Sequence, residues 1–344
     1  MKKSIIIYSF LCTTTIFSSS LELLSQQVPF TAEEITFYSG DFKLVGELKL
    51  PRGNELHGVV IFVHGDGPND RTSGGSYPPI MERMLSAGFA TFAWDKPGTG
   101  ESTGSLIRSE LFMQRAGIVL DGIEVLKKHP SINQNMIGLW GISQAGYVMA
   151  RVLEESKDIE FMIAVSCPGE ASVAQTSYLI SRQAICAGID SAEARKIERL
   201  YEAAERAQTY GEYVNYKSKI DSFPALEKMG IKMRVRPENE WEKPDLNGKY
   251  YFDPMKIVEK IKITVLVFFG EKDTQADPVQ GVAAWRKAFE KAGNKNYQIE
   301  LIPGVDHCMF ISKTGCLEEA FNREVTRYEP LFLNIIEEWL LNIK

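Results

Sequence analysis

The sequence predicts an α/β fold, in which helices cover both faces of a mostly parallel sheet. Short, continuously apolar segments of strand length alternate with longer segments whose apolar residues recur at helical spacing. Strands that are apolar throughout are buried on both faces, which is typical of parallel sheets with helical crossovers. The composition agrees, because 44% of the 344 residues are hydrophobic and 24% are charged, as in ordinary globular domains.

The first two strands are predicted to form a hairpin, because residues 34–39 and 42–50 alternate apolar and polar side chains on either side of Gly40-Asp41. Further strands are predicted from short apolar segments at residues 59–64, 90–95, 136–141, 161–166, 264–270 and 297–302. Helices are expected between them at residues 80–87, 111–127, 144–155 and 279–292. A last helix is indicated by an apolar stripe with helical spacing, formed by Phe332, Ile335, Ile336, Trp339, Leu340 and Ile343.

Residues 170–251 interrupt this alternation. They contain no convincing strand, and charged helical patterns such as residues 192–208 replace the apolar segments. We interpret them as a helical cap inserted into an α/β core formed by residues 26–169 and 252–344. Seven of the thirteen tyrosines fall in the cap, at positions 178, 201, 210, 213, 216, 250 and 251. Most are expected to pack its helices together, and a few to line a substrate pocket.

The N-terminal residues have the layout of a secretory signal peptide. Lys2 and Lys3 precede an apolar stretch, residues 5–17, which a run of serines follows. The alternative, that this stretch is the first element of the fold, is weaker because the stretch is apolar on every side. We expect residues 1–25 to direct export, so that the mature protein is periplasmic or secreted.

Export would make disulfides possible. The cysteines that remain in the mature chain are Cys167, Cys186, Cys308 and Cys316, and four cysteines allow three pairings. Buried free thiols are the alternative. The spacing does not choose between these arrangements.

Charge and hydropathy exclude several classes of partner. The net charge of −6 and the absence of a dense cluster of lysines and arginines argue against nucleic acid. No run of 18 apolar residues predicts a permanent membrane span. With four histidines and no pair of cysteines separated by two residues, a metal site is not expected. The expected partner is a small molecule, and the oligomeric state stays open.

The segment from Gly141 to Gly146 carries the clearest chemical signal. An apolar strand ends in Gly141-Ile142-Ser143 and passes directly into a helical pattern. A serine at such a strand-to-helix turn adopts a strained conformation, and its neighbours must be small because strand and helix backbones nearly touch. Gly141, Ala145 and Gly146 meet this requirement, so Ser143 is predicted to be a nucleophile.

A serine hydroxyl needs a base, and histidine is the usual one. His57 precedes a strand, His129 ends a helix in a solvated position, and His64 ends a strand where a structural role is favoured. His307 lies in a loop just past the last strand, at the sheet edge that also carries Ser143. His307 is therefore the predicted base.

The acid that orients His307 is expected in a loop at the same edge. Asp273 follows the strand at residues 264–270, and Asp277 is its rival. Asp306 is adjacent to His307 in sequence and cannot easily reach its ring. Asp273 is favoured, and the order Ser143, Asp273, His307 is that of α/β hydrolases.

Two main-chain N–H groups are expected to stabilise the negative oxygen of the tetrahedral intermediate. One belongs to Gln144, at the start of the helix after the nucleophile, where the helix dipole assists. The other is expected at Asp66, with Gly65 and Gly67 as alternatives. A carboxylate aimed at the oxyanion would oppose it, so the side chain of Asp66 is expected to point away, toward Arg71.

Taken together, these motifs resemble those of the α/β-hydrolase-fold serine hydrolases over essentially the whole mature chain. The shared marks are the HG-x-G-P-x-D-R loop at residues 64–71, the turn at residues 94–102, the serine elbow, and the segments that carry Asp273 and His307. The chain is most similar to short-chain carboxylesterases with this loop, within the broader serine-aminopeptidase-like branch. It departs from the family pattern at Ala145 and Pro97, where glycine is usual.

The resemblance implies a serine esterase that works through an acyl-enzyme and needs no cofactor. Ser143 would attack the ester carbonyl, His307 would transfer the proton, and Asp273 would orient the imidazole. An exopeptidase or an acyl thioesterase with the same triad is the alternative, and a binding protein without turnover is a third reading. Tyr178, close after the strand at residues 161–166, is expected to form a wall of the acyl pocket.

Overall fold

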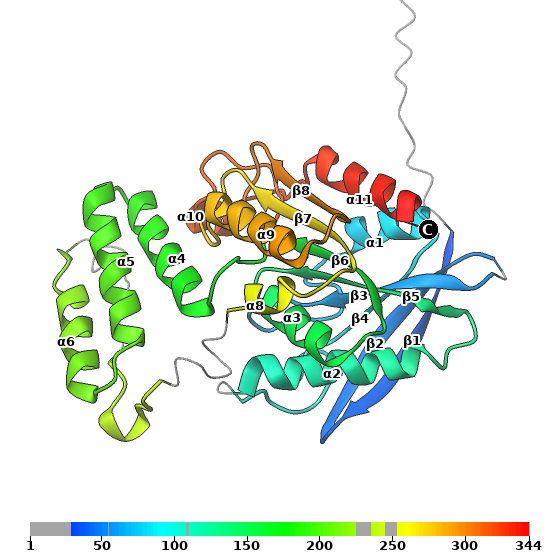
Figure 1. Cartoon of the computed structure of the whole chain (residues 1–344), viewed down its shortest axis with the longest axis horizontal. Helices are drawn as coiled ribbons and strands as arrows, with labels where there is room; N and C mark the ends of the chain where they lie inside the picture. Colours follow the sequence, from blue (N-terminus) through cyan, green and yellow to red (C-terminus); the bar gives the residue numbers. More distant parts are fainter. Residues whose placement is uncertain (1–28, 54, 108–109, 225–234, 245–252, 344) are drawn as a thin grey trace, which may run out of the picture.

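The computed structural model describes residues 29–53, 55–107, 110–224, 235–244 and 253–343. A single twisted sheet with helices on both faces forms the body of the molecule, and a group of helices extends from one side of it (Figure 1). The predicted signal peptide, residues 1–25, lies outside the described residues.

The sheet has eight strands in the order β1-β2-β4-β3-β5-β6-β7-β8. Their bounds are β1 Phe30–Ser39, β2 Phe42–Pro51, β3 His57–Val63, β4 Ala90–Trp94, β5 Ile132–Ile142, β6 Ile159–Val165, β7 Thr264–Gly270 and β8 Tyr297–Ile302. The β1–β2 and β2–β4 pairs are antiparallel, and the other pairs are parallel. The predicted fold, with its N-terminal hairpin, is confirmed.

Helices cover the two faces of the sheet in separate layers (Figure 1). One face packs against α1 (Pro78–Ser86) and α11 (Pro330–Ile343). The other packs against α2 (Leu111–Leu126), α3 (Ala145–Glu155), α8 (Met255–Val258) and α9 (Pro278–Ala292). Alternate residues of each central strand enter opposite layers, as Val60 and Ile61 do in β3. Both faces are therefore apolar, which explains the continuous hydrophobic segments in the sequence.

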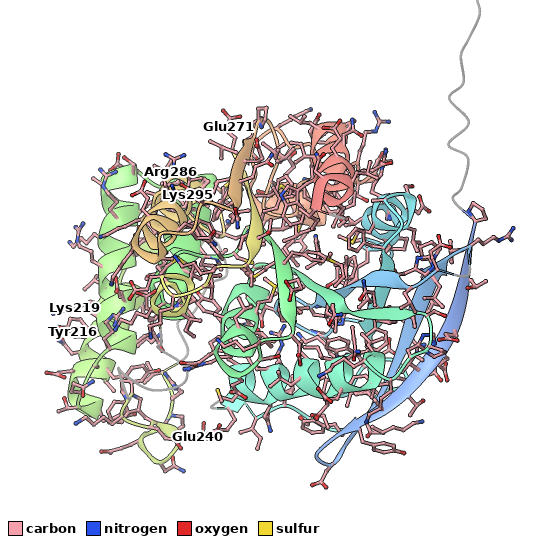
Figure 2. All side chains as sticks on the ribbon, turned by 45° about the vertical axis from the view of Figure 1, so that its right-hand side comes forward. Tyr216, Lys219, Glu240, Glu271, Arg286 and Lys295 are labelled. Carbon is pink, nitrogen blue, oxygen red and sulfur yellow. A yellow bond between two sulfur atoms is a disulfide. The ribbon has the colours of Figure 1, made fainter. Side chains whose placement is uncertain are left out.

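Three helices between β6 and β7 lie beside the sheet with an apolar core of their own (Figure 1). They are α4 (Ser172–Cys186), α5 (Ser191–Glu205) and α6 (Tyr210–Asp221), followed by the short helix η2 (Glu238–Glu240). Tyr213 is buried in this core, and Tyr201, Tyr210 and Tyr216 pack against it. Figure 2 shows Tyr216 and Lys219 on the side of α6 that is turned away from the sheet.

A disulfide joins the helical group to the body of the molecule. Cys186, the last residue of α4, is bonded to Cys316, which directly precedes α10 (Leu317–Phe321). The two residues are 130 positions apart in sequence and their Cα atoms are 5.9 Å apart. Cys167 and Cys308 are free thiols. None of the three complete pairings of the four cysteines is therefore formed: the structure contains one bond and two free thiols.

Candidate active site

Ser143 stands at the turn between β5 and α3, and its backbone is strained. Its φ angle is 58°, in the left-handed region that side chains other than glycine rarely adopt. A Cβ atom placed on Gly141 would lie 2.7 Å from the Cβ of Ala145, and one on Gly146 would lie 2.8 Å from the Cβ of Cys167. Strand and helix thus approach so closely that glycine is needed at both positions. Ala145 is accommodated because Gly141 has no side chain.

His307 and Asp273 meet in loops that follow β8 and β7. Nδ1 of His307 lies 2.8 Å from Oδ2 of Asp273, and the two side chains are 5% and 0% exposed. The other carboxylate oxygen accepts hydrogen bonds from the main-chain N–H groups of Gln275 (2.8 Å) and Ala276 (2.9 Å). Burial lowers the pKa of His307, but the charge and hydrogen bond of Asp273 outweigh it, so that the pKa is raised.

The two rival carboxylates have other partners. Asp277 caps α9, where Oδ1 accepts from the N–H groups of Val279 and Gln280 at 2.9 and 3.1 Å. Asp306 forms an ion pair with Arg323 at 2.6 Å. The structure therefore brings His307 to Asp273, and it places Asp277 and Asp306 in structural roles.

Two other histidines are held by hydrogen bonds or ion pairs away from any nucleophile. Nε2 of the buried His64 donates to the main-chain oxygen of Trp94 (2.6 Å), and Nδ1 lies 2.9 Å from the hydroxyl of Tyr77. Burial lowers the pKa of His64 to about 3, so the ring is neutral. His129, which the sequence placed in solvent, instead pairs with Glu33 at 2.5 Å.

Two cavities meet at Ser143, and Asp66 and Gln275 also line both. The first, which we call the apolar cavity, measures about 230 Å³. Besides Ser143 and His307 its lining includes Tyr77, Ile80, Trp140, Ile142, Val165, Phe310, Tyr328 and Phe332. The second, which we call the polar cavity, measures about 260 Å³ and lies between the elbow and the helices α4 and α5. Its lining includes Gln144, Tyr147, Ser172, Gln175, Thr176, Tyr201 and Glu205.

Ser143 and His307 thus share one cavity. Within the described part of the chain no hydrogen bond joins the Ser143 hydroxyl to the His307 ring. Cys308 lines the same cavity, but burial raises the pKa of its thiol to about 12. Because the thiolate is the reactive form of cysteine, Cys308 does not compete with Ser143 as a nucleophile.

The expected oxyanion donors lie at the same place. Asp66 and Gln144 both line the polar cavity, and within the described residues neither main-chain N–H has an acceptor. The carboxylate of Asp66 does not point toward Arg71, as the sequence suggested. It accepts from Nε2 of Gln144 at 2.9 Å, whereas Arg71 pairs with Asp95 at 2.8 Å.

Comparison with known proteins places the chain in a family. Residues 120–312, more than half of the chain, match the family described as BAAT / acyl-CoA thioester hydrolase C terminal. The chain belongs to this family. A curated relative is an uncharacterized 31.7 kDa protein in the traX-finO intergenic region of Escherichia coli, 24% identical over 265 residues, with 73% of this chain and 87% of the relative covered.

Solved structures similar to this member of the BAAT / acyl-CoA thioester hydrolase family include two esterases. The esterase Pf2001 of Pyrococcus furiosus is 18% identical, with a TM-score of 0.55 and coverage of 91% of this chain and 93% of that chain. Est1E of Butyrivibrio proteoclasticus is 15% identical, with a TM-score of 0.53 and coverage of 90% and 98%. At these identities the likeness shows the α/β-hydrolase fold.

The role of Tyr178 as a pocket wall stays a prediction. Its hydroxyl donates to the main-chain oxygen of Asp273 at 3.2 Å, and it is not among the described residues that line either cavity. Among the tyrosines of the helical group, Tyr201 lines the polar cavity. The sequence of α4 does not decide whether Tyr178 faces a cavity or the loop that carries Asp273, because this depends on how the helix docks.

The sequence reasoning also missed two buried cations beside Ser143. Lys96 donates to the main-chain oxygens of Gly65 and Gly67. Arg115 donates to the main-chain oxygen of His64 and to the side-chain oxygen of Gln144. A signal for Arg115 was present, since it lies on the apolar face of its helix. Lys96 directly follows Asp95 in the turn at residues 94–102.

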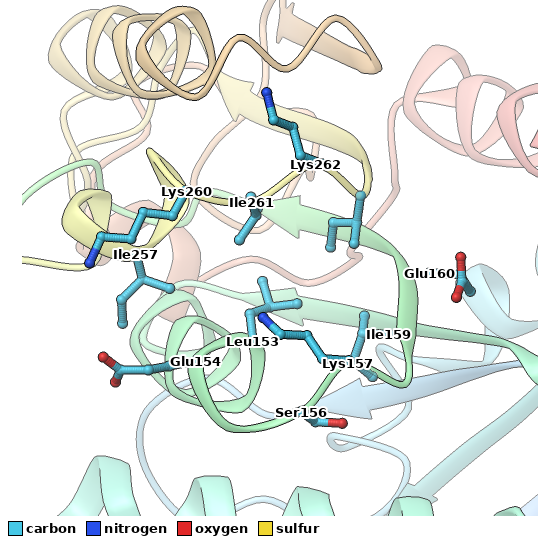
Figure 3. A pocket seen from close by; sticks show the side chains of 11 residues that line it. Leu153, Glu154, Ser156, Lys157, Ile159, Glu160, Ile257, Lys260, Ile261 and Lys262 are labelled. Atoms are coloured by element: carbon cyan, nitrogen blue, oxygen red, sulfur yellow. The ribbon is translucent and has the colours of Figure 1, made fainter.

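A third cavity lies at the opposite edge of the sheet, where β6 and β7 begin (Figure 3). It measures about 490 Å³, and Leu153, Ile159 and Ile257 line it together with Lys157 and Lys260. It contains none of the predicted catalytic residues.

The described residues contain no group of three or more histidine, cysteine, aspartate or glutamate side chains arranged to hold a metal ion. No described helix has both the length and the apolar character needed to cross a membrane.

Proposed function

We propose that this chain is a serine hydrolase that cleaves short-chain carboxylic esters through an acyl-enzyme. The observation that carries the proposal is the buried 2.8 Å contact between His307 and Asp273 beside a cavity that Ser143 also lines. Ser143 attacks the ester carbonyl while His307 takes its proton and then gives it to the leaving alcohol. Asp273 holds the imidazole in the required tautomer and stabilises its cation. Water then cleaves the acyl-enzyme by the same proton transfers, without a cofactor.

The negative oxygen of the tetrahedral intermediate is stabilised by the main-chain N–H groups of Gln144 and Asp66. The N–H of Gln144 stands at the N-terminus of α3, where the helix dipole favours negative charge. The absence of other acceptors for these two groups in the described chain supports this role, because N–H groups without partners are available to a ligand.

A short acyl group is favoured by the size of the apolar cavity. Its volume of about 230 Å³ is below the roughly 300–1,000 Å³ usual for small-molecule sites. Ile80, Trp140 and Phe332, which line it, are fully packed in the core. Each added CH₂ group therefore contributes about 0.8 kcal/mol until the cavity is full, and longer chains are excluded.

Hydrolysis of an acyl thioester is the second candidate, and the family match favours it. The same triad serves both reactions, since an acyl-enzyme forms from either substrate. An exopeptidase has less support. Glu205 lines the polar cavity, but it pairs with Lys217 at 2.8 Å and Arg236 at 3.1 Å, so it offers no free carboxylate to a substrate amino group.

The test combines covalent labelling with substrate comparison. A fluorophosphonate should label the wild-type protein and the control Ser172→Ala, whose serine lines the polar cavity, but not Ser143→Ala. Rates are then measured for a short-chain aryl ester, the thioester of the same acid, and an amino-acyl arylamide. Faster cleavage of the thioester would transfer the assignment to the second candidate. Labelling of Ser143→Ala would refute the proposed nucleophile.

We also propose that the protein acts in an oxidising compartment after export. The Cys186–Cys316 disulfide supports this, because such bonds persist in the periplasm or outside the cell and are rare in the cytosol. Fractionation of cells that express the full chain, with mass spectrometry of the N-terminus, tests it. A cytosolic protein that retains residues 1–25 would contradict the proposal.

A further inference from the structure

A buried lysine contacts the loop that follows β3. Lys96 is 6% exposed, and its Nζ atom lies 3.0 Å from the main-chain oxygen of Gly65 and 2.5 Å from that of Gly67. Within the described residues no carboxylate forms an ion pair with it. Burial lowers the pKa of Lys96 to about 7, so keeping this charge inside the protein is costly. A residue that only filled space would do so better with an apolar side chain.

The contact with Gly65 fixes the direction of the next N–H group. In a trans peptide the C=O and N–H bonds point in opposite directions, and none of the described peptide bonds is cis. Because the oxygen of Gly65 points at Lys96, the N–H of Asp66 points away from it. Asp66 lines both cavities together with Ser143, and its N–H has no acceptor within the described chain.

A second buried cation contacts the same loop and the side chain of Gln144. Arg115, on α2, donates to the main-chain oxygen of His64 and to Oε1 of Gln144, the latter at 2.6 Å. The side chain of Gln144 in turn donates to Asp66 at 2.9 Å. Neither Lys96 nor Arg115 lines either cavity, and both donate to main-chain oxygens of the loop that follows β3. A carbonyl that is hydrogen-bonded to a cation also polarises its amide, which strengthens the N–H as a donor.

We propose that Lys96 is a positioning residue for the oxyanion site, which turns the Asp66 N–H toward Ser143 through its contact with the Gly65 carbonyl. This inference rests on the proposed serine hydrolase function. If it is correct, replacing Lys96 destabilises the transition state, in which the oxyanion exists, and leaves substrate binding unchanged. Loss of one oxyanion donor costs about 10²–10³ in kcat, so misorientation of one should cost about 10–100-fold.

The experiment compares Lys96→Met, Lys96→Gln and Lys96→Arg with the control Lys127→Met, which removes a lysine paired with Asp158 away from the cavities. Four quantities are measured: kcat and KM for a short-chain aryl ester, the Ki of a trifluoromethyl ketone, and the Ki of the matching amide. The ketone adds to a catalytic serine to form an oxyanion, whereas the amide resembles the ground state. Thermal unfolding is recorded for each variant.

For Lys96→Met we expect kcat to fall about 10–100-fold and the ketone to bind more weakly by a similar factor, with KM and amide binding nearly unchanged. Lys96→Arg, which keeps cationic donors, should recover part of the loss, and Lys96→Gln should lie between Met and Arg. If the Met variant does not fold, the Gln and Arg variants decide by the same comparison. Unchanged kcat and ketone affinity, or a rise in KM alone, would overturn the inference.

Failure of the inference can be told from failure of the proposed function. If a fluorophosphonate labels Ser143 in the wild type and the Lys96 variants keep full kcat, only the role of Lys96 is wrong. If Ser143→Ala remains active, the proposed function itself is wrong.

Discussion

Replacement of Asp273 by asparagine is the sharpest test of the triad, because the structure fixes how the new side chain must sit. One carboxylate oxygen of Asp273 accepts from the main-chain N–H groups of Gln275 and Ala276, and the other contacts His307. In Asp273→Asn the amide oxygen must take the first position, since the NH₂ group is a donor and cannot accept hydrogen bonds from these two N–H groups. The NH₂ group then faces Nδ1 of His307.

This arrangement forces the wrong tautomer on the base. With a donor opposite, Nδ1 must act as an acceptor, so the ring proton moves to Nε2 and the ring can no longer take the proton of Ser143. In serine proteases the same exchange lowers kcat by about 10⁴-fold, or about 5.4 kcal/mol of transition-state stabilisation. We expect a loss of that order here, with little change in KM.

The assay is kcat for a short-chain aryl ester, with thermal unfolding as a check on the fold. Asp277→Asn is the matched control, because Asp277 caps α9 and asparagine caps a helix nearly as well. It should leave kcat within about twofold of the wild type. An Asp273→Asn enzyme with more than a tenth of wild-type kcat, or an equal loss in the control, would refute this reasoning.

Three further predictions follow from the same geometry. Ile80→Ala, which enlarges the apolar cavity, should move the optimum of an acyl chain-length series to longer chains; an unmoved optimum would place the acyl group elsewhere. Replacing Cys186 and Cys316 by serine should lower the free energy of unfolding by about 2–5 kcal/mol, measured by denaturant titration against the oxidised wild type. The pKa of His307 is raised and its protonated form is inactive, so kcat/KM should fall as the pH drops through a value above 6.5; an acid limb well below 6.5 would contradict the assignment.

The elements that carry Ser143, Asp273 and His307 could be predicted from the sequence because their signals are local. Continuous apolar segments identify buried parallel strands, and the small residues Gly141 and Gly146 indicate a tight turn at Ser143, where the structure is crowded. Parallel strands end at the same sheet edge, so the loops after β7 and β8 could be expected to bring an acid and a base together. The choice of Asp273 over Asp277 used only distance from the strand end, and the structure puts His307 beside Asp273.

The remaining features depend on contacts between distant parts of the chain. Asp66 and its partner Gln144 are 78 residues apart, and the bonded cysteines are 130 residues apart. No periodic pattern of apolar and polar residues in the sequence predicts contacts between residues so far apart. The contact of the Tyr178 hydroxyl with the main-chain oxygen of Asp273 could not be predicted for the same reason, because it depends on how α4 docks on the body of the molecule.

The two buried cations explain how a loop rich in glycine can hold a donor in place. Gly65 and Gly67 flank Asp66, and glycine permits many backbone conformations. Lys96 holds the carbonyls on both sides of Asp66, and Arg115 holds that of His64, so the peptide groups are fixed from behind by hydrogen bonds. Hydrogen bonds from Lys96 and Arg115 thus hold this loop, and this is why we expect the effect of replacing Lys96 to fall on the proposed oxyanion site.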